Sequence, residues 1–90
     1  MDKKAFIITA DSRSNAVLPE NGTDFSLGEL NKIVGGHIEV VWIDDDHIMV
    51  LNEEGKLNGL PFNMAATLLY NNPNDYIVGD VLFCHKSMVK

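Results

Sequence analysis

The chain has 90 residues, of which 46% are hydrophobic and 22% charged, and its formal net charge is −6. This length suffices for a single domain, residues 1–90, with one modest core, and the composition excludes a disordered chain. The acidic balance disfavours direct binding to nucleic acid, and no apolar run approaches the roughly 18 residues that a membrane helix needs.

We therefore expect a soluble cytoplasmic protein with no membrane partner. The only cysteine, Cys84, cannot form an intramolecular disulfide and lies in an apolar run, which suits a reducing compartment. Its predicted role is that of a small buried hydrophobe rather than a nucleophile.

The first predicted strand covers residues 5–9, where β-branched and aromatic residues cluster between polar flanks. The polar connection over 11–24 contains turn chemistry at 19–22. Residues 16–18 could add a short edge strand, because an unstructured connection of this length is uncommon.

A first helix is predicted to begin after Ser26, since Ser26 and Glu29 have the spacing of a capping box. Leu27, Leu30 and Val34 then form one apolar stripe. The helix should end at Gly35, where glycine can adopt the left-handed conformation.

Residues 37–43 and 47–51 predict a β-hairpin around the acidic turn 44–46. Alternation places Val40 and Trp42 on one face of its first strand and Glu39 on the other. Trp42 is expected in the core, as aromatic residues at strand periodicity usually are.

Pro61 suits the first turn of a second helix, where a missing N–H costs nothing. Helical spacing then predicts one face packed on a sheet, and residues 71–73 end the helix. Residues 76–85 read as a strand buried on both faces. The predicted helix face consists of Phe62, Ala65, Ala66, Leu69 and Tyr70.

The order of elements is thus βαββαβ, which predicts an α+β fold with a four-stranded, mainly antiparallel sheet and two short helices on one face. The ferredoxin-like arrangement is one topology with this order. Six acids and no lysine or arginine occur over 36–55, whereas several lysines lie near the termini. If both termini lie on one side of the sheet, the domain is electrically polarised.

Two glycine-containing turns are the candidate binding surface, and each also has a purely structural explanation. A helix stop followed by a strand explains the first turn, and local turn chemistry with a positive φ at Gly55 explains the second. We favour these structural explanations, but loops held by rigid elements often bind ligands. The candidate residues are Gly35, Gly36, Asn52, Glu53, Glu54, Gly55, Lys56 and Asn63.

No catalytic, metal-binding or cofactor-binding group is predicted. Asp44, Asp45, Asp46 and His47 lack the spacing of a calcium loop or a zinc site. The glycines match no phosphate-binding motif. Glu53 and Glu54 are adjacent rather than opposed, which does not suit a general acid and base.

Three segments carry a resemblance to a known family: residues 34–39, the Asn-Glu-Glu-Gly-Lys-Leu-Asn-Gly-Leu-Pro block at 52–61 with Asn63, and residues 77–79. Over about residues 27–83 the chain resembles domain of unknown function 3846, a family of small proteins from bacteria, phages and other mobile elements. Relatives tend to have arginine after Asn63, where this chain has Met64. The resemblance identifies relatives and implies no activity.

The first hypothesis for function is a non-enzymatic binding or regulatory accessory module of a bacterial mobile element or phage, with an unknown protein partner or small ligand. The alternative is a small homo-oligomer that sequesters a soluble ligand such as a nucleotide, using backbone amides at the glycine turns. A carboxylate-dependent hydrolase that uses Glu53 and Glu54 ranks last, so we expect no enzyme.

Overall fold

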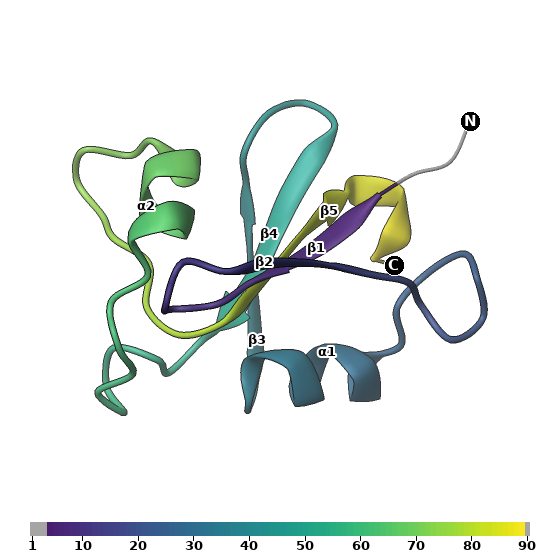
Figure 1. The fold of residues 1–90 in the computed structure, drawn as a ribbon, viewed down its shortest axis with the longest axis horizontal. Coiled ribbons are helices and arrows are strands. Elements are labelled where there is room, and N and C mark those ends of the chain that lie inside the picture. The colour runs from purple at the N-terminus through teal and green to yellow at the C-terminus, as the bar shows by residue number, and fades with distance from the viewer. Residues whose placement is uncertain (1–3, 90) are drawn as a thin grey trace.

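The computed structural model describes residues 4–89 and has five strands around which two α-helices and a 3-10 helix are arranged (Figure 1). The strands form one antiparallel sheet in the order β2-β1-β5-β4-β3. Neither α-helix in this range is long and apolar enough to cross a membrane. The elements are β1 (Ala5–Ile8), β2 (Ser14–Val17), α1 (Leu27–Val34), β3 (Ile38–Trp42), β4 (His47–Asn52), α2 (Met64–Tyr70), β5 (Val81–His85) and η1 (Lys86–Met88).

The predicted α+β class with two helices is confirmed, but the predicted number of four strands is wrong. The additional strand, β2, lies in the long polar connection where a short edge strand was considered. It pairs with β1 along its whole length, with Phe6 opposite Ala16 and Ile7 opposite Asn15. The exposed polar side chains of Ser14 and Asn15 concealed it, although Val17 at its end packs against a core cluster.

The strand order is not that of a ferredoxin-like fold. A split βαβ unit leaves room for another strand between the two strands that its helix connects. Here α2 connects β4 to β5, and these two strands pair directly, with Met49 opposite Phe83 and Val50 opposite Leu82. β1 lies on the far side of β5, so β5 is the central strand of the sheet.

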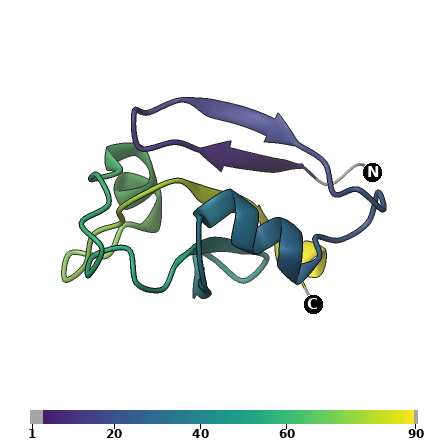
Figure 2. The ribbon, with the colours of Figure 1, turned by 90° about the horizontal axis from the view of Figure 1, so that it is seen from below.

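The two helices pack on opposite faces of the sheet, contrary to the expectation of one face. Alternate residues of a strand point to opposite faces. Val50 and Leu82 pack in one core cluster with Leu30 of α1, whereas Met49 and Val81 pack in a second cluster with Ala66 of α2. In Figure 2, α1 crosses the sheet in the foreground and α2 lies toward the left end of the molecule.

α1 begins and ends where the sequence predicts. The Ser26 hydroxyl accepts a hydrogen bond from the Glu29 amide at 3.1 Å, and the Glu29 carboxylate accepts one from the Ser26 amide at 2.8 Å. Gly35 follows the helix with φ of 79°. Leu30 and Val34 are buried as expected, but Leu27, in the first turn, is 64% exposed.

α2 begins later than predicted, at Met64, and its N-cap is Asn63 rather than a residue before Pro61. The Asn63 side chain accepts a hydrogen bond from the Ala66 amide at 3.0 Å and so caps the first turn of the helix. A helix that began at Pro61 would lack this cap. Phe62 therefore precedes the helix, forms a β-bridge with Val78 and is 50% exposed, so its predicted place in the core is wrong.

The last predicted strand is shorter than the apolar run that suggested it. Gly79 adopts φ of 76° and separates the buried residues Ile77 and Val78 from β5. Within β5 the prediction of burial on both faces is confirmed, since neighbouring Val81 and Leu82 are both fully buried.

Trp42 is not in the core: it is 60% exposed, on the outermost strand of the sheet. The β3–β4 hairpin extends away from α1, which lies near the start of β3 (Figure 1). Strand periodicity correctly grouped Trp42 with Val40 on one face, but the helix that covers this face ends short of both.

The predicted separation of acidic and basic residues does not hold for Lys86, and Lys3 and Lys90, on which the prediction also rested, lie outside the described residues. β5 leads directly to the tip of the acidic hairpin, where the Lys86 amide donates to the Asp46 carbonyl at 2.8 Å. The Lys86 ammonium donates to the Asp45 carbonyl at 2.9 Å and lies 3.8 Å from the Asp46 carboxylate. A lysine from the C-terminal part of the chain thus offsets the hairpin acids.

Candidate functional site

The two glycine-containing turns, separate in sequence, meet in space at the end of α1. The Asn52 side chain donates to the Val34 carbonyl at 3.1 Å, and the Glu53 amide donates to the His37 carbonyl at 2.9 Å. A Cβ atom on Gly36 would lie 3.0 Å from the Asn52 amide nitrogen, so glycine permits this close approach. The structure therefore brings the two predicted segments together.

Most of the predicted binding residues there have structural roles. Asn52 is buried, and its side-chain oxygen accepts from the Glu54 amide at 2.8 Å. Asn63 is fully buried, and its side chain donates to the carbonyls of Ile8 and Gly79 at 3.0 and 2.8 Å. The side-chain nitrogen and oxygen of both asparagines are thus hydrogen-bonded within the chain.

Gly55 is required for space rather than for a positive φ, which corrects the prediction. The positive φ in this segment belongs to Gly59, at 68°. Gly55 is buried, and a Cβ atom on it would lie 2.9 Å from a methyl group of Val78 and 3.3 Å from the Asn52 carbonyl oxygen. Its role is to let segment 53–59 pack on segment 77–79.

The backbone amides that the nucleotide hypothesis requires are already hydrogen-bonded. The amides of Gly35 and Gly36 donate to the Asn31 carbonyl at 2.8 and 3.0 Å, and the Gly55 amide donates to the Asn52 carbonyl at 3.1 Å. These three glycine amides are therefore not free to bind a phosphate group. The glycine turns thus fit their structural explanation.

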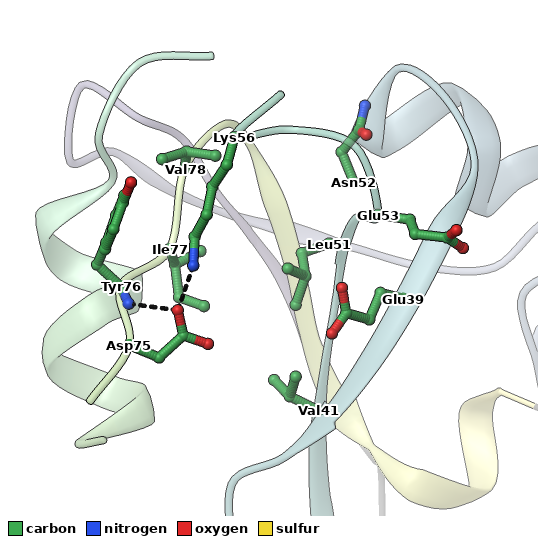
Figure 3. A pocket seen from close by; sticks show the side chains of 10 residues that line it. All are labelled: Glu39, Val41, Leu51, Asn52, Glu53, Lys56, Asp75, Tyr76, Ile77 and Val78. Atoms are coloured by element: carbon green, nitrogen blue, oxygen red, sulfur yellow. Dashed lines mark hydrogen bonds and ion pairs between the residues drawn. The ribbon is translucent and has the colours of Figure 1, made fainter. Parts of the chain in front are cut away.

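A shallow pocket with a volume of about 110 Å³ lies on the α2 face, between the β3–β4 strands and segment 75–78 (Figure 3). Apolar side chains form its floor, and four charged side chains and a tyrosine surround it. The floor residues are Val41, Leu51, Ile77 and Val78, and the remaining lining residues are Glu39, Asn52, Glu53, Lys56, Asp75 and Tyr76.

Lys56 is held on one side of the pocket by an ion pair with Asp75 (Figure 3). The hydrogen bond to the Asp75 carboxylate raises the pKa of Lys56, and the same bond lowers the pKa of Asp75. The Lys56 nitrogen also lies 4.3 Å from the centre of the Tyr76 ring, a cation–π contact. Its charge is therefore compensated within the site.

Glu39 and Glu53 supply the charge that no ion pair compensates, although the Glu39 carboxylate is close enough to Lys56 to contribute to the raised pKa of the lysine. Both side chains are exposed, and among residues 4–89 neither carboxylate makes a hydrogen bond or ion pair. With Lys56 paired to Asp75, the lining side chains carry a net charge of −2. Glu54 points elsewhere, toward His37, with 3.9 Å between its carboxylate oxygen and the His37 Nδ1 atom.

Sequence reasoning found Glu53 and Lys56 but missed Glu39, Asp75 and Tyr76 as members of the site. Nothing local marks these three, because they come from β3 and from the segment that follows α2, and only the pairing of distant segments joins them. Of the candidate residues, Gly35, Gly36, Gly55, Glu54 and Asn63 do not line the pocket.

The acidic turn of the hairpin has the structure of a turn rather than of a metal site. The Asp44 carboxylate accepts from the backbone amides of Asp46 and His47, both at 2.8 Å, and from the His47 ring at 2.9 Å. These bonds, led by the one from the Asp46 amide, lower the pKa of Asp44. No group of three histidine, cysteine or acidic side chains in the described part of the chain is arranged to hold a metal ion.

Comparison with known proteins gives one match. The family model described as domain of unknown function 3846 matches residues 4–88, which covers almost the whole chain. No curated protein and no solved structure matches. The three segments that suggested this family from the sequence, 34–39, 52–63 and 77–79, all meet beside the pocket, and the chain belongs to the family of domain of unknown function 3846.

Proposed function

We propose that the protein is a non-enzymatic binding module, serving a bacterial mobile element or phage as an accessory protein, as the family resemblance suggests. Its site is the pocket between β3 and segment 75–78, and its ligand is a basic side chain of a partner protein. The observation that carries this proposal is the pair of uncompensated carboxylates, Glu39 and Glu53, above an apolar floor.

The chemistry of the pocket matches lysine or arginine. Both side chains have an aliphatic stem that packs on apolar groups and a cationic end that stays near water. Val41 and Leu51 offer the stem a surface, the Glu39 carboxylate offers the cation an acceptor, and Glu53 adds negative charge at the side of the pocket (Figure 3). At about 110 Å³ the pocket is smaller than the roughly 300 Å³ at which small-molecule sites begin, so one side chain suits it better than a nucleotide.

The electrostatics of the site support the same ligand. Asp75 already neutralises Lys56, so an incoming cation does not have to displace an unpaired one. Charge pairs at an exposed site contribute roughly 0.2 to 1 kcal/mol each, which gives selectivity for charge and a moderate affinity. Binding should therefore weaken as salt concentration rises.

A selection from a random peptide display library tests the proposal. Peptides enriched on the wild-type protein should be rich in lysine and arginine, and this enrichment should disappear with the double variant Glu39→Gln/Glu53→Gln. Both positions are exposed, so the circular dichroism spectrum should not change.

A matched control removes the same charge away from the pocket. Glu20 and Asp45 are exposed and do not line it, so Glu20→Gln/Asp45→Asn has the same net charge as the pocket variant. Peptides selected on this control should still be enriched in lysine and arginine. Equal enrichment by the pocket variant and the wild type would show that the pocket does not select the ligand.

A further inference from the structure

β3 is an outer strand of the sheet, and its hydrogen-bonding pattern shows which of its groups face outward. In an antiparallel ladder, residues alternate between those bonded to the partner strand and those whose N–H and C=O point away. The Ile43 amide bonds the His47 carbonyl at 3.0 Å, and the Glu53 amide bonds the His37 carbonyl at 2.9 Å. These two bonds show that the odd-numbered residues of β3 are the ones bonded to β4.

Glu39 and Val41 therefore bond to β4, whereas Ile38, Val40 and Trp42 direct their N–H and C=O groups away from the sheet. Across residues 4–89 no hydrogen bond reaches these outward groups. Three consecutive outward positions are enough for one short added strand.

The opposite edge of the sheet is protected, and this one is not. Natural edge strands avoid pairing by being short, polar, charged or interrupted by proline. β2 is short and carries Ser14 and Asn15, both exposed. β3 has neither lysine nor proline, and its outward residues are Ile38, Val40 and Trp42.

The side chains of β3 present different chemistry on the two faces of the edge. On the α1 face, Val40 is 40% exposed and Trp42 is 60% exposed, and neither belongs to the core cluster that includes Ile38. On the α2 face, Glu39 stands at the pocket with Glu53 (Figure 3). A strand beside β3 would contact an apolar surface on one face and carboxylates on the other.

We propose that β3 accepts an extended segment of a partner protein as an added strand, with apolar residues on the Trp42 face alternating with basic residues on the Glu39 face. This inference rests on the proposed function, because the basic residue opposite Glu39 is the one that enters the pocket. Main-chain bonds supply affinity in this mode of recognition, and alternate side chains supply specificity.

A second copy of the chain is a poorer occupant of this edge. Each copy has a net charge of −6, with six acids and no lysine or arginine over 36–55, and β3 lies within that segment. Pairing β3 with β3 would bring two such segments together, and like charges across an interface oppose association.

The probe is a short fluorescein-labelled peptide that alternates valine and lysine, compared with one that alternates valine and glutamate and with a scrambled valine–lysine peptide. Fluorescence anisotropy should show binding of the alternating lysine peptide alone. Trp42 is the only tryptophan, so its emission should shift to the blue as the added strand covers it. Hydrogen exchange should slow at the amides of Ile38, Val40 and Trp42.

The decisive variant is Val40→Pro, which removes an outward N–H and leaves the bonds to β4 in place. It should weaken peptide binding by roughly tenfold, because one main-chain hydrogen bond to the peptide is lost and the proline bends the edge strand. Trp42→Lys, at an exposed position, should weaken it similarly without affecting folding. The matched control is Ala16→Pro, which removes an outward N–H from the edge at β2 and should have no effect.

Three outcomes would overturn the inference. If peptide binding depends on Glu39 and Glu53 but Val40→Pro binds normally, the pocket binds a side chain without an added strand, and only the proposed function survives. If no lysine peptide binds, both proposals fail. If the protein alone sediments as a dimer and the amides of β3 are already protected, a second copy occupies the edge.

Discussion

The side-chain amide of Asn63 donates to the Gly79 carbonyl at 2.8 Å, across 16 residues of sequence. The same nitrogen donates to the Ile8 carbonyl at 3.0 Å, and the side-chain oxygen caps α2 through the Ala66 amide. One fully buried side chain thus joins the end of β1, the turn before β5 and the start of α2. This position lies beside the sequence block 52–61 that suggested the family, and it holds three parts of the fold together.

Asn63→Ala should therefore destabilise the protein strongly. It leaves two carbonyls without their donors and removes a helix cap, and the combined cost is about 2 to 4 kcal/mol. The free energy of unfolding, measured with urea and circular dichroism, checks this value. Asn74→Ala, at an exposed position in the turn after α2, should change it by less than about 0.5 kcal/mol. A similar loss in both variants would contradict the role assigned to Asn63.

The same substitution at two glycines should have opposite effects. At Gly55 a Cβ atom would lie 2.9 Å from a Val78 methyl group, and overpacking of this kind costs about 1 to 3 kcal/mol. At Gly28, in α1, the nearest atom is the Ser26 hydroxyl at 3.9 Å, so alanine should stabilise the helix by up to about 1 kcal/mol. Thermal unfolding followed by circular dichroism measures both. A stabilising Gly55→Ala would show that segment 53–59 is not packed as described.

Cys84 should be unreactive in the folded protein. It is fully buried in the central strand, and burial raises its pKa to about 11, so little thiolate forms at neutral pH. Labelling with iodoacetamide at pH 8 should be slow in buffer and fast in concentrated urea. Equal rates under both conditions would mean that β5 opens readily, contrary to its central place in the sheet.

Stability should fall in acid for identifiable reasons. The hydrogen bond from the Ser26 amide lowers the pKa of Glu29, and the bond from the Asp46 amide lowers that of Asp44. Because each carboxyl has a lower pKa when folded, the unfolded chain binds protons first. The stabilisation is therefore complete above the ordinary values of 4.5 and 3.8 and is lost as the pH falls through the lower, folded values.

The variant Glu29→Gln/Asp44→Asn should show a shallower loss of stability below about pH 4 than the wild type, since neither amide titrates. Urea unfolding across a series of pH values measures the slope. Glu20→Gln/Asp45→Asn serves as the control, because among residues 4–89 neither of these carboxylates accepts a hydrogen bond, and it should retain the slope of the wild type. Identical slopes in all three proteins would rule out Glu29 and Asp44 as the source of the loss of stability in acid.

Local features of this fold were predictable from the sequence. Ser26, Glu29 and Gly35 define α1 through contacts within a few residues, and the β3–β4 hairpin follows from its alternation and its acidic turn. Two local rules competed at the start of α2, where Pro61 and Asn63 both suit a helix N-terminus. Asn63 prevailed because tertiary bonds to Ile8 and Gly79 fix it in place.

Features that depend on distant segments were not predictable in this way. Trp42 and Phe62 have the periodicity of core residues, but their burial depends on whether another element covers them. The pocket has the same origin, since Glu39 and Asp75 meet only because β4 pairs with β5. Of the candidate residues, Asn52, Glu53 and Lys56 remain at the proposed site. Gly35, Gly36, Gly55 and Asn63 have structural roles around it, and Glu54 points away toward His37.

The central strand of the sheet, β5, is also the last of its five strands along the chain, so it is synthesised after the other four. During translation, β1 with β2 and β3 with β4 can each form a hairpin, but no strand joins the two hairpins until residue 85 has left the ribosome. Until then, β1 and β4 each have an edge open to other nascent chains. We infer that the rate at which β5 is captured, rather than the rate of hairpin formation, decides between folding and aggregation in the cell.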